Sequence, residues 1–148
     1  MRLRSLLVNT RPDLTGIRGE RTAAMTTTEA RARISEEFMS RFHEWLDDYA
    51  EMPDMEYGRK YGWAKNPEVE AKNDMKSLIR FQKYIFSGLW DYQWVKLGYE
   101  QRTLWELKKE GFLSYQMYSN WEARATGKTD FYYISQKTAK EIYKASKA

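Results

Sequence analysis

Residues 99–135 read YEQRTLWELKKEGFLSYQMYSNWEARATGKTDFYYIS, and the first third of this stretch predicts a helix with a well-marked end. Leu104 and Leu107 have the spacing of one helix face over about residues 99–110. Gly111 follows, and glycine is the residue type that most easily adopts the left-handed conformation just past a helix C-terminus. We therefore expect a helix that buries both leucines and ends at Gly111.

The remainder of the stretch predicts two antiparallel strands and a further helix. Segments 114–121 and 130–134 are rich in aromatic residues, and Thr126-Gly127-Lys128 between them supplies a turn, so the pair is expected to form a hairpin. Ser135 is a favourable N-cap for a final helix that continues toward the C-terminus.

Two more helices are expected upstream. Thr26 and Glu29 have the spacing of a capping box ahead of a one-sided apolar run over residues 34–49. A second helix is expected from Asn66, as N-cap before a proline, to about Leu89. The fold class that follows is mainly α with a small antiparallel β-hairpin.

This order of elements resembles the winged helix-turn-helix superfamily over about residues 74–148. The residues behind the resemblance are the Gly111-Phe112-Leu113 step, the basic hairpin after it, and the strand Phe131-Tyr132-Tyr133-Ile134-Ser135 that leads into a helix. The resemblance implies that the helix before Gly111 is a recognition helix for the DNA major groove and that the hairpin is a wing that contacts phosphate or the minor groove. The preceding helix of the motif is either abbreviated or placed earlier, near Leu89–Leu97. One winged-helix-like domain over 26–148, with an added N-terminal helix, is expected.

The expected DNA contacts are basic residues of this helix and hairpin. With both leucines inward, the 100° step of a helix turns the following residues outward: Arg102, Trp105, Glu106 and Lys109. Arg102 is suited to a guanine edge and Lys109 to phosphate. Arg124 and Lys128 flank the hairpin turn and are expected to meet backbone phosphates. DNA binding by a small regulator or accessory protein is the favoured function.

A protein-interaction module, such as a compact inhibitor or subunit, is the alternative. Glu106 repels phosphate, and tryptophan at Trp105 is typical of protein-binding hot spots. A loop is expected over residues 53–66, and its possible partner-binding residues alternate aromatic rings and cations: Tyr57, Arg59, Lys60, Tyr61 and Trp63. These residues could bind a partner, or they could pack between the first two helices. We favour packing, because a chain with so many aromatic residues needs some of their rings in its core. A component of a ribonucleoprotein assembly is a weaker alternative.

Composition argues against catalysis and cofactors. The 148 residues are 42% hydrophobic, enough for one core, and include no cysteine and one histidine, His43. No thiol nucleophile or histidine-rich metal site is available, so we expect no enzyme activity, no metal and no cofactor. The lack of cysteine and of a long apolar run is consistent with a cytoplasmic or other reducing location and with no membrane partner.

The first residues differ in character from the rest. Residues 1–24 contain five arginines against two acidic residues and have no sustained apolar period, so residues 1–25 are expected to be a disordered basic arm or leader. The apolar face of the first helix, with Phe38, Phe42 and Trp45, is expected either to form a homodimer or to pack against its own domain.

Overall fold

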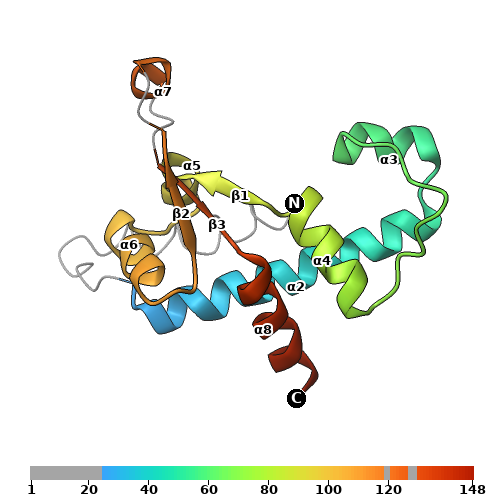
Figure 1. The fold of residues 1–148 in the computed structure, drawn as a ribbon, viewed down its shortest axis with the longest axis horizontal. Helices are drawn as coiled ribbons and strands as arrows, with labels where there is room; N and C mark the ends of the chain where they lie inside the picture. Colours follow the sequence, from blue (N-terminus) through green and yellow to red (C-terminus); the bar gives the residue numbers. More distant parts are fainter. Residues whose placement is uncertain (1–24, 119–120, 127–129) are drawn as a thin grey trace, which may run out of the picture.

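The computed structural model describes residues 25–118, 121–126 and 130–148, except the side chains at positions 123 and 124. These residues form a mainly helical chain with a small three-stranded antiparallel sheet (Figure 1). The helices are α2 (Thr27–Glu51), α3 (Asp54–Tyr61), α4 (Met75–Tyr84), α5 (Asp91–Lys96), α6 (Gln101–Lys109), α7 (Trp121–Thr126) and α8 (Gln136–Lys147). The strands are β1 (Gly88–Trp90), β2 (Ser114–Met117) and β3 (Asp130–Tyr133).

Helix α2 forms the base of the molecule and begins where its capping box predicted. The Glu29 amide donates to Thr26 Oγ1 at 3.0 Å, and the Thr26 amide donates to Glu29 Oε1 at 3.1 Å, which confirms the box. The helix runs beneath most of the other elements, from α6 at its N-terminal end to α3 at its C-terminal end (Figure 1). One element therefore links both ends of the fold.

The sheet has β3 at its centre. Its order is β1-β3-β2 with both pairings antiparallel; Phe131 of β3 lies opposite Trp90 on one side and Gln116 on the other. The pairing of β2 with β3 confirms the expected hairpin. Strand β1 was not predicted, because three residues are too short to show an alternating pattern.

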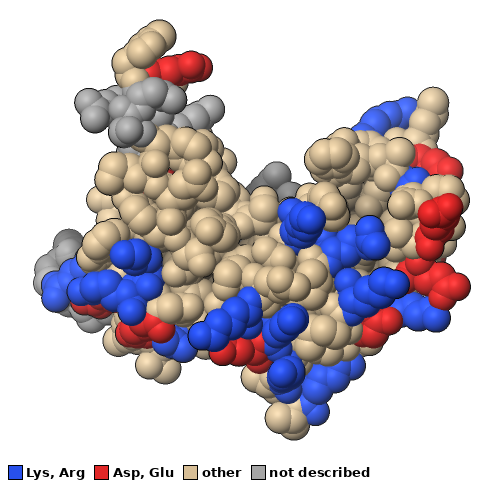
Figure 2. Space-filling view, viewed as in Figure 1, with Lys and Arg blue, Asp and Glu red and all other residues tan. Residues whose placement is uncertain are grey.

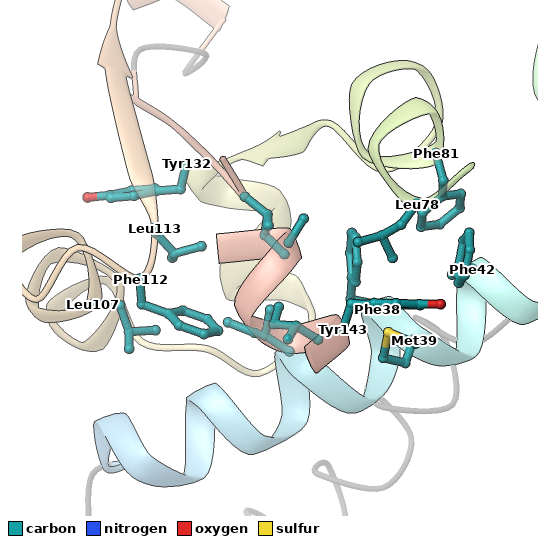
Figure 3. Close-up of a cluster of buried hydrophobic side chains, with 14 of the residues drawn as sticks. Phe38, Met39, Phe42, Leu78, Phe81, Leu107, Phe112, Leu113, Tyr132 and Tyr143 are labelled. Atoms are coloured by element: carbon teal, nitrogen blue, oxygen red, sulfur yellow. The ribbon is translucent and has the colours of Figure 1, made fainter. Parts of the chain in front are cut away.

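The core is continuous across the molecule (Figure 3). At the α2–α4 end, the fully buried Phe81 ring lies 5.4 Å from Phe38 and 5.5 Å from Phe42, centroid to centroid. Toward the sheet, Leu107, Phe112, Leu113 and Tyr132 cluster, with α8 between the two groups. Burying each large apolar side chain contributes about 1.5–3 kcal/mol. Phe38, Phe42 and Trp45 are buried by their own chain, so that face of α2 is covered within the monomer.

The expected loop over 53–66 was wrong in its first half. Residues 54–61 form helix α3, in which Pro53 is the N-cap and Gly62, with φ +79°, adopts the left-handed conformation that ends it. The aromatic residues Tyr57 and Tyr61 are four residues apart, a spacing that places both on one helix face.

The second helix begins later and ends earlier than expected. Asn66 starts a turn, since its Oδ1 accepts the Glu68 amide at 3.0 Å. The helix begins after Asp74, whose carboxylate accepts the Ser77 amide at 2.9 Å. Residues 67–73 have no apolar face that a helix could bury. Leu89 belongs to β1 instead.

The hairpin strands are shorter than expected. Strand β2 ends at Met117, and residues 121–126 form α7, where the sequence had suggested a continuing strand and a turn starting at Thr126. The preceding helix of the motif was expected to be short or to lie near Leu89–Leu97, and α5 lies within this interval. The helix before Gly111, with φ +84°, and the Ser135-capped final helix are confirmed. Across the described residues, no helix has the length and apolar character needed to span a bilayer.

Candidate nucleic-acid interface

Helix α6 is held rigidly against α2 at both of its ends. At the N-terminal end, the Met25 amide donates to Glu100 Oε1 at 2.8 Å and Thr103 Oγ1 donates to the Met25 carbonyl at 2.9 Å. At the other end, Arg31 donates to Glu110 Oε1 from Nη2 at 2.6 Å and from Nε at 3.2 Å. Any ligand that contacts α6 therefore meets a fixed surface.

The side chains of α6 divide as the helical period predicted. Leu104 and Leu107 are fully buried, whereas Arg102 and Lys109 are exposed. The Arg102 side chain is 84% exposed, and its Nε lies 3.6 Å from Glu106 Oε2, a distance too long for a hydrogen bond. No described residue forms an ion pair with Lys109. Both cations are available to an incoming anion.

Trp105 joins α6 to strand β2. Its ring packs edge-on against Tyr115, with 5.4 Å between centroids, and remains 42% exposed. Lys108 Nζ lies 4.5 Å from the centre of the Trp105 ring, within cation–π range. Lys108 was missed in the sequence; the three-residue spacing from Trp105 to Lys108 was the signal that could have indicated it.

A partly buried hydrogen bond links the two strands of the hairpin. Tyr115 donates its hydroxyl hydrogen to Asp130 Oδ1 at 2.7 Å. Burial and this hydrogen bond raise the pKa of Tyr115 to about 12, so the phenol keeps its proton at neutral pH. Beyond this point, the exposed apolar side chains Met117 and Trp121 extend along the hairpin. The Arg124 side chain and Lys128 lie outside the described residues.

The residues of the aromatic segment divide between core and surface. Tyr57 is buried and its hydroxyl accepts the Trp45 indole N–H at 2.8 Å; Tyr61 donates to Asp48 Oδ2 at 2.5 Å. Lys60 bridges Glu44 and Asp48 at 2.7 and 2.6 Å. These three side chains fasten α3 to α2. Arg59 and Trp63 are exposed.

The contacts of Asp48 favour its charged form. Burial opposes the charge, but the hydrogen bonds from Lys60 and Tyr61 outweigh it, and the pKa of Asp48 is lowered. Burial and the bond to Asp48 raise the pKa of Tyr61. The acidic residues Glu44 and Asp48 of α2 therefore bind side chains of α3.

Among the described residues, no group of three or more histidine, aspartate or glutamate side chains is arranged to hold a metal ion.

Charge is unevenly distributed over the visible face of the molecule. Figure 2 shows Lys and Arg side chains around the α6 end and over α4, whereas the face over the sheet is mostly uncharged.

No known protein family, curated protein or solved structure matches this chain.

Proposed function

We propose that this chain is a winged-helix protein that binds duplex DNA, as a small non-enzymatic regulator or accessory factor. The observation that carries the proposal is the chain path: α5 and α6 lie between β1 and β2, and β3 returns to the centre of the sheet as β1-β3-β2. Such a path leaves the second of two short helices exposed beside a hairpin. In helix-turn-helix proteins, the second helix enters the major groove.

The charges on α6 agree with this role. Glu110 forms an ion pair with Arg31, and Glu100 accepts a backbone amide, so two of the three glutamates in residues 100–110 make contacts within the fold. Arg102 and Lys109 face solvent. In the proposed complex, Arg102 meets a base edge or phosphate and Lys109 meets phosphate, while Arg124 and Lys128 of the hairpin contact the backbone.

Docking of a protein partner is the second candidate function. Its supporting observation is a run of exposed apolar side chains, with Trp105 42%, Met117 60% and Trp121 79% exposed. Tryptophan is enriched in the energetic centres of protein interfaces. Trp105 would be the anchor of such an interface.

Salt dependence distinguishes the two functions. We would measure fluorescence anisotropy of a labelled mixed-sequence duplex against the full chain across a salt series. Each phosphate contact contributes about −0.9 to the slope of log K against log salt. Replacing two contacting cations in the Arg102→Ala/Lys109→Ala variant should reduce the steepness by up to about 1.8. The matched control is Lys76→Ala/Lys144→Ala, which removes the same charge from exposed positions on α4 and α8.

The two outcomes are clear. A steep slope that flattens in the α6 variant and not in the control supports DNA binding. Absence of duplex binding at low salt by a folded chain, or equal losses in both double variants, refutes it. In that case, capture of a protein partner that depends on Trp105, tested with Trp105→Ala, becomes the leading hypothesis.

A further inference from the structure

A cavity of about 260 Å³ lies at the end of the molecule away from α6, between α2, α3 and α4. Half of its ten lining residues are aromatic: Trp45, Tyr49, Tyr57, Trp63 and Tyr84. An apolar cavity of about 150 Å³ holds one benzene ring. This cavity therefore has room for one or two fused rings with a small polar group, but it is below the usual size for larger ligands.

The floor and the rim of the cavity differ. Trp45 and Tyr57 form a fixed floor, since they are 2% and 3% exposed and share a hydrogen bond. Trp63 and Tyr84 form the rim, 61% and 48% exposed, with ring centroids 6.3 Å apart. Two large rings that remain so exposed beside a preformed cavity offer apolar area that a flat ligand would cover.

Arg80 gives the cavity its charge preference. It is partly buried on α4, it lines the cavity, and no described residue gives it a hydrogen bond or an ion pair. No acidic side chain is among the lining residues. A second cation, Lys83, is not among the lining residues, but its Nζ lies 5.3 Å from the ring centre of Tyr84. Figure 2 shows Lys and Arg side chains over α4 on this face.

We propose that this cavity binds a small planar aromatic carboxylate. The ring of the ligand lies between the floor and the Trp63–Tyr84 rim, and its carboxylate pairs with Arg80. The planar guanidinium of arginine matches a carboxylate with two parallel hydrogen bonds, which a neutral or cationic ligand cannot accept in the same way. The site is spatially separate from the proposed DNA-binding surface, because none of its lining residues belongs to α6 or the hairpin.

The test is calorimetric titration of the full chain with 2-naphthoate, alongside the neutral isostere 2-naphthamide. Naphthoate is expected to bind one site with a Kd below about 1 mM, and naphthamide about tenfold more weakly. Arg80→Gln removes the charge and should weaken naphthoate binding about tenfold without affecting naphthamide. Arg59→Gln, an exposed arginine on α3 outside the lining, is the matched control and should leave the Kd unchanged within about twofold.

A second variant keeps the proposal testable if Arg80→Gln does not fold. Trp63→Ala removes an exposed rim ring and should weaken both probes, while circular dichroism confirms that each variant is folded. The proposal is overturned if naphthoate shows no saturable binding, if naphthamide binds equally well, or if Arg59→Gln weakens binding as much as Arg80→Gln. It is also overturned if neither Arg80→Gln nor Trp63→Ala changes the Kd.

Discussion

Gly88, the first residue of β1, lies so close to β3 that a side chain at this position would clash with it. A β-carbon at this position would lie 2.5 Å from the Tyr133 Cβ, 2.8 Å from the Tyr132 carbonyl oxygen and 2.9 Å from Phe131 Cε2. Carbon atoms in favourable contact are about 3.5–4.0 Å apart. Gly88→Ala therefore requires β1 to move away from β3.

The free-energy cost of Gly88→Ala depends on which atoms of β3 the new methyl group would displace. Overpacking a well-packed site costs about 1–3 kcal/mol. Two of the three contacts here are with a backbone oxygen and a β-carbon, which no side-chain rotation can relieve, so we expect the upper part of that range, about 2–3 kcal/mol. In a chain of this size, 1 kcal/mol corresponds to roughly 3–5 °C in Tm. Gly88→Ala should lower the Tm by about 6–15 °C.

Gly58 provides the matched control. It lies within helix α3, and a β-carbon there would have no atom within 4 Å. Alanine in a helix interior is favoured over glycine by about 0.5–1 kcal/mol, so Gly58→Ala should raise the Tm by a few degrees. Thermal unfolding followed by circular dichroism compares the two substitutions directly. A Gly88→Ala protein as stable as the original chain would show that β1 does not pair with β3 in this register.

Two further predictions concern the contacts between α2 and α3. Asp48→Asn weakens the acceptor shared by Lys60 and Tyr61 and should cost about 1 kcal/mol in urea unfolding at pH 7. The pKa of Asp48 is lowered in the folded state, so this stabilisation is complete above the unfolded pKa of about 3.9 and is lost as the pH falls through the folded pKa. The difference in the free energy of unfolding between the two proteins should therefore disappear below about pH 4. A difference that does not depend on pH would contradict this prediction. Tyr57→Phe leaves the buried Trp45 indole N–H without its acceptor and should cost about 1–3 kcal/mol, measured by the same method. An unchanged urea midpoint would mean that Trp45 finds another acceptor.

The elements that the sequence predicted well are those with a local signal at their ends. The side chains of Thr26 and Glu29 each accept the other's backbone amide and cap α2, Ser135 caps α8, and Gly111 ends α6 in the left-handed conformation. Each signal depends on residues within four positions, so no knowledge of the tertiary structure was needed. The inward and outward faces of α6 followed from the same local period.

The errors arose where distant residues decide the structure. Asn66 begins a turn although it has the sequence of a helix start, and the helix begins only after Asp74. Strand β1 exists only because β3 lies beside it. The cavity was missed for the same reason: no local sequence signal marks Arg80, and only the fold brings it beside rings from α2 and α3.

The length of α2 has a mechanical consequence for the two proposed surfaces. A helix of 25 residues is about 37 Å long. Its N-terminal end is bonded to α6 through Arg31 and Met25, while Trp45 and Tyr49 near its other end form part of the cavity wall. As a stiff lever, α2 pivoting by 5° about its N-terminal end would carry its C-terminal end through about 3 Å, close to the thickness of one aromatic ring. Conversely, a displacement of about 3 Å of α2 at the cavity corresponds to a change of only about 5° in the angle between α2 and α6.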